Sequence, residues 1–155
     1  MLTNIKRQWA VDSYRWFFMA QPCHYPEKMI EAYGFERCIW KKLDKKGVGM
    51  SAFTPEAPAE CIRCCNAENF HAVYEHHRAA VGIDPVHDEA DLHRKFDMPM
   101  RVPCGEKSHV NRSYKPMEAW RERASDVRGT MLACRHYLAE EVPDETYREL
   151  CNSFR

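Results

Sequence analysis

The chain has 155 residues, and its 23 lysine and arginine residues balance its 23 aspartate and glutamate residues. This length favours one domain of ordinary size, and a formal net charge of zero argues against a general electrostatic attraction to nucleic acid or to an anionic membrane. The longest apolar run near the N-terminus covers residues 16–20, too short for a signal peptide or a membrane span. We therefore expect a cytoplasmic protein whose eight cysteines are mostly reduced thiols.

Helices are predicted over most of the first 96 residues, with almost no strands. The expected ranges are 5–20, 26–33, 35–46, 67–80 and 86–96, with a turn at 51–58 that leads into 59–65. Pro26 suits the first turn of its helix, and Asn66 suits the position that caps the N-terminus of the next one. The tryptophans at helical positions are expected in the core: Trp9, Trp16, Trp40 and Trp120.

The last 59 residues are expected to alternate between strands and helices. Strands are predicted at 98–104 and 129–134, with helices at 116–123 and from Pro143 onward. Two strands that flank a helix suit a parallel β–α–β unit, although Arg101 and Pro103 are unfavourable in a buried central strand. Two strands do not make a stable sheet alone, and an α/β fold normally has strands along its whole length. The imbalance predicts that these residues correspond to half of a larger fold.

His136 follows the second predicted strand directly and precedes the last helix. A loop after a strand is where α/β enzymes hold a general base. The alternative is an ordinary histidine on a surface loop, and the local pattern alone favours this alternative; the residues that follow His136 change the balance. A nucleophilic pair of Cys134 and His136 is not supported, because strand neighbours at positions i and i+2 point the same way without converging.

The surroundings of His136 resemble the end of an α/β hydrolase, where the catalytic base lies in Gly-His-aromatic-x-x-x-Glu-x-Pro. Here the segment is Arg135-His136-Tyr137-Leu-Ala-Glu-Glu141-Val-Pro143, with arginine in place of glycine. Further matching pieces follow in family order: Tyr14-x-Trp16-x-Phe18-x-Ala20-Gln21-Pro22, Ser51-Ala52-Phe53-x-Pro55, Glu75-x-x-Arg78-Ala79, Ile83-Asp-x-x-His87-Asp88, Gly105-Glu-Lys and Trp120-Arg-x-x-Ala124-Ser-Asp-Val127. From residue 14 to 154 the chain resembles the second half of the haloacetate (fluoroacetate) dehalogenases, with epoxide hydrolases as near neighbours.

This resemblance implies an α/β fold in which a helical lid, residues 1–96, precedes the C-terminal strand–helix–strand–helix part of the core, residues 97–155. In the family an aspartate attacks the carbon that bears the halogen, and a histidine then activates water to hydrolyse the ester. The base would be His136. The halide-contacting positions would be Trp16, Arg15 and His77; the family has histidine and tyrosine at the last two.

The family's nucleophile, oxyanion hole and second acid precede its lid, so we expect them outside these 155 residues and expect the chain to be inactive alone. Whether it is an enzyme is left open. Its substrate would be a haloacid-like small molecule once another chain complements it, without a cofactor. The alternatives are a non-catalytic remnant or interaction protein, and an epoxide-hydrolase-like protein. Exposed strand edges predict a homo-oligomer or a complementing chain as partner, and neither nucleic acid nor a membrane.

A zinc site is a competing interpretation of one group of residues: Cys61, Cys64, Cys65, His71, His76 and His77. The three cysteines would share one helical face. No second pair of ligands follows at zinc-finger spacing, however, and free cysteine packs like a small apolar residue. We expect small buried cysteines here and no metal.

Overall fold

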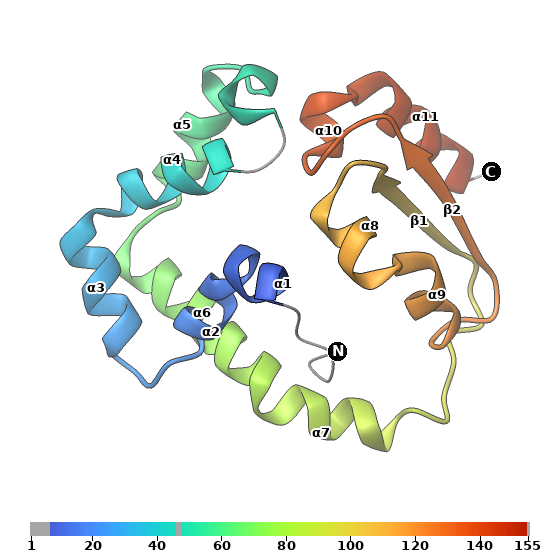
Figure 1. The fold of residues 1–155 in the computed structure, drawn as a ribbon, viewed down its shortest axis with the longest axis horizontal. Coiled ribbons are helices and arrows are strands. Elements are labelled where there is room, and N and C mark those ends of the chain that lie inside the picture. Colours follow the sequence, from blue (N-terminus) through green and yellow to red (C-terminus); the bar gives the residue numbers. More distant parts are fainter. Residues whose placement is uncertain (1–6, 46–47, 155) are drawn as a thin grey trace. The chain divides into compact units, whose positions relative to one another are not determined.

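The computed structural model describes residues 7–45 and 48–154 (Figure 1). Its elements, in chain order, are α1 (Arg7–Asp12), α2 (Tyr14–Met19), α3 (Tyr25–Tyr33), α4 (Phe35–Lys45), the 3-10 turn η1 (Gly49–Ala52), α5 (Glu56–Arg63), α6 (Ala67–Val81), α7 (Ile83–Ala90), β1 (Met100–Gly105), α8 (His109–Tyr114), α9 (Pro116–Arg121), β2 (Val127–Leu132), α10 (Leu138–Glu141) and α11 (Pro143–Ser153).

Two of the predicted helices are confirmed almost to the residue. The prediction at 26–33 corresponds to α3, and that at 35–46 corresponds to α4, although residue 46 lies outside the described residues. Gly34 separates them with a φ of 99°, which glycine adopts without steric cost. The predicted cap of α6 is also confirmed, because the side chain of Asn66 accepts a hydrogen bond from the Asn69 N–H at 2.9 Å.

The single helix predicted over residues 5–20 is wrong, since α1 and α2 are separate; residues 5 and 6 lie outside the described part of the chain. Ser13 breaks the helix with φ −112° and ψ 11°. Its carbonyl accepts from Trp16, three residues on, which closes a tighter turn than the helix. The boundary predicted at residues 82–85 is also misplaced, because α7 begins at Ile83 and holds Pro85 in its first turn.

The chain folds into two compact units. The first unit combines residues up to Ile39 with Ala59–Ala90, and the second combines Trp40–Pro58 with the residues from Asp91 onward. This division does not coincide with a lid of residues 1–96 and a core of residues 97–155, because the segment 40–58 belongs to the unit that contains the strands. The lid-and-core division stays a prediction.

The first unit is centred on α6. Tyr74 on that helix is completely buried and Phe70 is 8% exposed. The Phe70 ring lies 4.7 Å from that of Phe35 on α4, and Pro26 at the start of α3 is also buried. Burial of aromatic side chains is the main source of stability in so small a core.

The second unit contains a parallel pair of strands, as predicted from the β–α–β pattern. Met100 pairs with Val127 and the register runs to Gly105 with Leu132, so β2 begins two residues before the predicted range of 129–134. Gly129 faces Met117 of α9, and the next residue, Thr130, bonds Glu149 of α11. Because successive residues of a strand point to opposite faces, helices cover both faces of the pair.

Pro103 lies within β1 although proline is unfavourable in a central strand. The N–H of Met100 donates to the Asp126 carbonyl at 2.8 Å, just before β2. The N–H of Glu106, just past β1, donates to the Leu132 carbonyl at 2.9 Å, at the end of β2. In a parallel ladder alternate residues bond the same neighbour, so the nitrogen of Pro103 faces away from β2. The ladder between the two strands therefore loses no donor.

The expectation that the tryptophans form the core is wrong for three of the four. Trp16 is 57% exposed, and Trp40 and Trp120 are each 41% exposed. These three side chains therefore lie at the surface. Within the described residues no helix is both long enough and apolar enough for a membrane span.

Candidate active site

The loop between β2 and α10 holds His136 at the carboxyl end of the two parallel strands. The backbone N–H groups of Arg135, His136 and Tyr137 all donate to the carboxylate of Glu141, at 2.8, 3.0 and 3.0 Å. Three successive donors on one carboxylate fix the course of the loop, so that the half-buried His136 is presented from a defined backbone.

Glu141 is ionised in this arrangement. Partial burial acts to raise its pKa, but the three backbone donors, with a smaller contribution from the charge of Arg135, hold the pKa of Glu141 below its ordinary value of 4.5. The sequence pattern placed Glu141 in the matching segment without a role. Its function as the anchor of the loop emerges only from the folded backbone.

Gly105, the last residue of β1, lets this loop lie directly against the strand. A Cβ atom at that position would overlap the carbonyl oxygen of Arg135 and come within 2.9 Å of the Cys134 carbonyl oxygen. The Lys107 N–H donates to that same Cys134 carbonyl at 3.1 Å. The ends of both strands therefore converge on the residues that precede His136.

Tyr137 connects the loop to the segment 40–58. Its ring lies 4.9 Å from the His136 ring and 5.0 Å from the Phe53 ring, in both cases edge to face. Its hydroxyl donates to the Lys42 carbonyl at 3.2 Å. One face of the imidazole is thus bordered by an aromatic side chain that is itself held in place.

Cys134 is not equipped as a nucleophile. It is 3% exposed, and burial, followed by the nearby Glu141 carboxylate, raises the pKa of its thiol above 9.0. A thiol of that kind carries almost no thiolate at neutral pH.

The structure brings together two of the predicted halide-contacting residues in the first unit. The Trp16 ring on α2 and the His77 ring on α6 are 5.9 Å apart and edge to face. His77 Nδ1 donates to the Val73 carbonyl at 2.8 Å, which orients its ring. Arg15 precedes Trp16 on α2 and is half-buried. His136 belongs to the other unit, so its relation to these residues stays a prediction.

Arg78, whose contacts were not predicted, links α6 to the loop after α2. Its Nε donates to the Gln21 carbonyl at 2.8 Å, and its guanidinium pairs with Glu27 at 2.6 Å and with Glu75. Both Gln21 and Arg78 lie in segments that match the family. The contact therefore joins two segments that are 57 positions apart in the sequence.

The expectation of buried cysteines at 61–65 is wrong for two of the three. Cys61 and Cys64 are exposed and Cys65 is half-buried. The three do not share one helical face, because α5 ends at Arg63 and the last two lie beyond it. All eight cysteines of the chain are free of disulfides.

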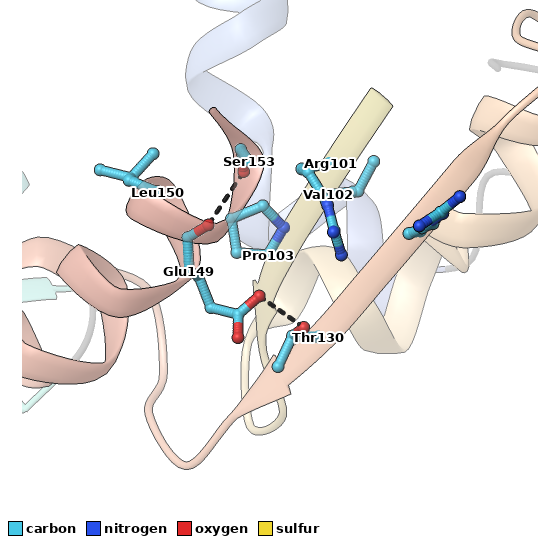
Figure 2. A pocket seen from close by; sticks show the side chains of 8 residues that line it. Arg101, Val102, Pro103, Thr130, Glu149, Leu150 and Ser153 are labelled. Atoms are coloured by element: carbon cyan, nitrogen blue, oxygen red, sulfur yellow. Dashed lines mark hydrogen bonds between the residues drawn. The ribbon is translucent and has the colours of Figure 1, made fainter. Parts of the chain in front are cut away.

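A pocket lies between α11 and the sheet, as Figure 2 shows. It is lined by Arg101, Val102, Pro103, Arg128, Thr130, Glu149, Leu150 and Ser153. The Thr130 hydroxyl donates to Glu149 Oε2 at 2.7 Å on one side of it. None of the predicted site residues lines this pocket.

No protein-family model matches the chain, but individual known proteins match it over nearly its whole length. A fluoroacetate dehalogenase from a Burkholderia species is 27% identical over 154 residues, which are 97% of this chain and 50% of the relative. A protein of Nostoc sp. PCC 7120, assigned to the α/β hydrolases, superposes with a TM-score of 0.91 and 43% identity over 97% of this chain and 52% of that chain. A protein of Pseudomonas aeruginosa, assigned as an epoxide hydrolase, superposes with a TM-score of 0.86 and 30% identity over 96% of this chain and 50% of that chain. The chain thus spans about half the length of the proteins that it matches.

Proposed function

We propose, because this chain is the counterpart of the C-terminal half of an α/β hydrolase, that it supplies the lid and the catalytic base of a haloacetate dehalogenase-type hydrolase. The nucleophile would come from the half of the fold that the match does not cover. Residues 1–96 would form the lid and residues 97–155 the end of the core.

The observation that carries this proposal is the anchored loop of His136. A histidine at the carboxyl end of parallel strands, on a backbone fixed by Glu141, is in the place and the setting of a general base. In the first step, a carboxylate oxygen would bond the substrate carbon as the carbon–halogen bond breaks and halide leaves. In the second, His136 would take a proton from water as the water oxygen attacks the ester carbonyl carbon. The hydroxyacid then leaves with that proton.

Trp16, His77 and Arg15 are proposed to receive the halide. The indole N–H of Trp16 is a donor without acceptor capacity, which suits an anion. His77 borders the same ring at 5.9 Å, and Arg15 would add a positive charge one residue away. Histidine in place of the family's tyrosine predicts a changed halide preference rather than loss of the subsite.

Complementation tests the proposal. The chain would be combined with the N-terminal half of the Burkholderia fluoroacetate dehalogenase, and fluoride release from fluoroacetate measured. We expect background release from the chain alone and release well above background from the mixture. His136→Gln should reduce the activity of the mixture by about 10²-fold or more, whereas His93→Gln, an exposed histidine of the same unit, should not change it.

Two results would contradict this assignment. One is halide release by the chain alone that survives His136→Gln. The other is activity of the mixture that is equal with and without His136. Tight association of the two halves without turnover would favour the alternative of a non-catalytic interaction protein.

Epoxide hydrolysis is the second candidate, because the Pseudomonas neighbour is assigned to that activity at 30% identity. The same aspartate–histidine chemistry would open an epoxide: the carboxylate would bond one ring carbon as its C–O bond breaks, and the ring oxygen would stay on the other carbon and take a proton from water to become a hydroxyl. The same mixture, given a terminal epoxide, separates the two candidates: formation of a diol without any halide release from haloacetates would favour the epoxide.

A further inference from the structure

Four side chains with metal-binding atoms meet in the first unit, away from the residues assigned to the hydrolase site. Cys23 and His24 lie on the loop between α2 and α3, Glu27 is in the first turn of α3, and His71 projects from α6. One ligand atom from each lies within 4.8 Å of all the others. The group offers one sulfur, two imidazole nitrogens and one carboxylate oxygen.

The fold holds this group together by contacts that do not depend on a ligand. His71 Nδ1 lies 3.3 Å from Glu27 Oε1, and Cys23 Sγ lies 2.8 Å from His24 Nδ1. Arg78 holds the loop through the Gln21 carbonyl and Glu27 through its carboxylate. The loop ligands are therefore positioned against α3 and α6 in advance.

Glu27 has capacity that the protein does not use. Its Oε1 accepts from Arg78 at 2.6 Å, while its Oε2 is buried and has no hydrogen-bond partner in the described part of the chain. A buried carboxylate oxygen is normally satisfied, and an unsatisfied one requires an explanation such as an ion. The oxygen that lies against His71 is Oε1, at 3.3 Å, and Oε2 gives the same carboxylate a second, unused oxygen.

We propose that Cys23, His24, Glu27 and His71 bind a divalent transition-metal ion of the zinc type. Cysteine, histidine and carboxylate are the ligands that Zn²⁺ takes in tetrahedral sites. The thiol and imidazoles select against Mg²⁺ and Ca²⁺, which prefer oxygen.

The surroundings complement a cation. Two carboxylates, of Glu27 and Glu75, face one guanidinium, of Arg78, so the group keeps a net negative charge before the thiol ionises. His71 Nε2 lies 3.9 Å from Glu75 Oε1. This separation is longer than a hydrogen bond, and a shift of about 1 Å would let Glu75 accept from the second imidazole nitrogen, which is the usual support of a metal-bound histidine.

The necessary rearrangement is small. Zinc bonds of about 2.0–2.3 Å place tetrahedral ligand atoms roughly 3.3–3.7 Å apart. Some atoms in the group must therefore approach by about 1 Å, and Cys23 Sγ and His24 Nδ1, at 2.8 Å, must move apart by roughly 0.5–1 Å. Cys23 and His24 are exposed side chains on a loop, and rotamer changes at these two residues can supply that shift.

Cobalt titration of the purified, metal-free chain tests the proposal, because Co²⁺ bound to a thiolate gives a charge-transfer absorption band. We expect one Co²⁺ per chain with this band, displaced by Zn²⁺. Cys23→Ser should abolish the band and weaken zinc binding by at least about tenfold. Glu75→Gln should weaken it by about 10–100-fold with the band retained.

Matched controls come from the same unit. Cys61→Ser removes an exposed cysteine of the 61–65 run, and His76→Asn removes an exposed histidine next to the group on α6; both should bind like the wild type. His71→Asn, checked for an unchanged helical circular dichroism signal, should weaken binding as Cys23→Ser does.

The site would be refuted by a wild-type chain that binds no Co²⁺ at millimolar concentration. It would equally be refuted by a charge-transfer band that persists in Cys23→Ser and disappears in Cys61→Ser, since this result would move the metal to the 61–65 run. Neither outcome depends on the hydrolase assignment.

Discussion

At the scale of single residues, Glu141 is the side chain on which the candidate base depends. It receives three successive backbone N–H groups of the loop, and hydrogen bonds to a charged group contribute about 1.5–3 kcal/mol each in favourable cases. An amide in its place keeps one acceptor oxygen and turns the other position into a donor, which faces N–H groups.

We predict that Glu141→Gln lowers the free energy of unfolding by roughly 1–3 kcal/mol near neutral pH. The folded-state pKa of Glu141 lies below its ordinary 4.5. This contribution is therefore complete above pH 4.5 and is lost as the pH falls through the lower folded-state value. Thermal unfolding of wild type and variant should differ at pH 7 and converge in acid. Glu140→Gln, at an exposed neighbour, should leave the midpoint unchanged, and a pH-independent difference for Glu141→Gln would contradict the mechanism.

Single residues also mark what the sequence could and could not predict of the site. His136 is a candidate because a strand, a loop and a proline-initiated helix surround it in a segment that resembles the end of an α/β hydrolase, and its role as the base stays a prediction. The anchoring of Arg135 by Glu141 was not predicted, because it is a backbone contact that only the folded loop forms. The close approach of Gly105 to the Arg135 carbonyl was not predicted, because these residues are far apart in the sequence. The group around His71 escaped notice for the same reason, as Glu27 and His71 are 44 positions apart.

At the scale of elements, α6 organises its unit. It supplies the buried Tyr74, the ring of His77, the guanidinium of Arg78 and His71. Its start is defined by Asn66, whose side chain accepts from the Asn69 N–H, while the Asn69 side chain donates back to the Cys64 carbonyl at 2.7 Å.

Asn66→Ala should destabilise the chain by about 1 kcal/mol, because the N-terminal N–H groups of α6 lose their acceptor. Asn66→Asp, which keeps an acceptor and adds a charge favourable at a helix N-terminus, should retain stability. Urea denaturation followed by circular dichroism would measure both. Equal loss in the two variants would show that the asparagine acts through its amide donor rather than as a cap.

Element boundaries were predicted well where a proline, a glycine or a capping residue marks them. Pro26, Gly34 and Asn66 belong to this group. They were predicted poorly where tertiary packing decides, as at the buried Ser13 that separates α1 from α2. The helix α8 was missed although Ser108 caps it, since its six residues carry too short a pattern.

At the scale of the whole molecule, large apolar side chains remain exposed in both units. In the second unit Phe154 is 87% exposed, Tyr147 69% and Met98 65%; in the first, Val11 is 59% exposed. Apolar side chains of this kind favour contact with another protein surface where they form a contiguous patch. This is the pattern expected of a chain that matches half of a larger fold.

We predict that the isolated chain associates with itself and that the complementing half competes with this association. Sedimentation velocity over a hundredfold range of concentration should show a rising average mass, and binding of an apolar dye should fall when the N-terminal half of a relative is added. A monomer at every concentration, with a cooperative thermal transition, would count against both parts.

The proline in β1 limits the form that such association takes. Because the nitrogen of Pro103 faces away from β2, a strand from another molecule that joined this edge would leave one carbonyl oxygen without a donor. Fibrils grow by repeating the same strand pairing in every layer, so the deficit would recur with each molecule added. The residue that is least suited to its strand therefore acts against amyloid-type polymerisation through the β1 edge, and it leaves the β2 edge and side-chain contacts between helices as the routes by which copies of this chain meet.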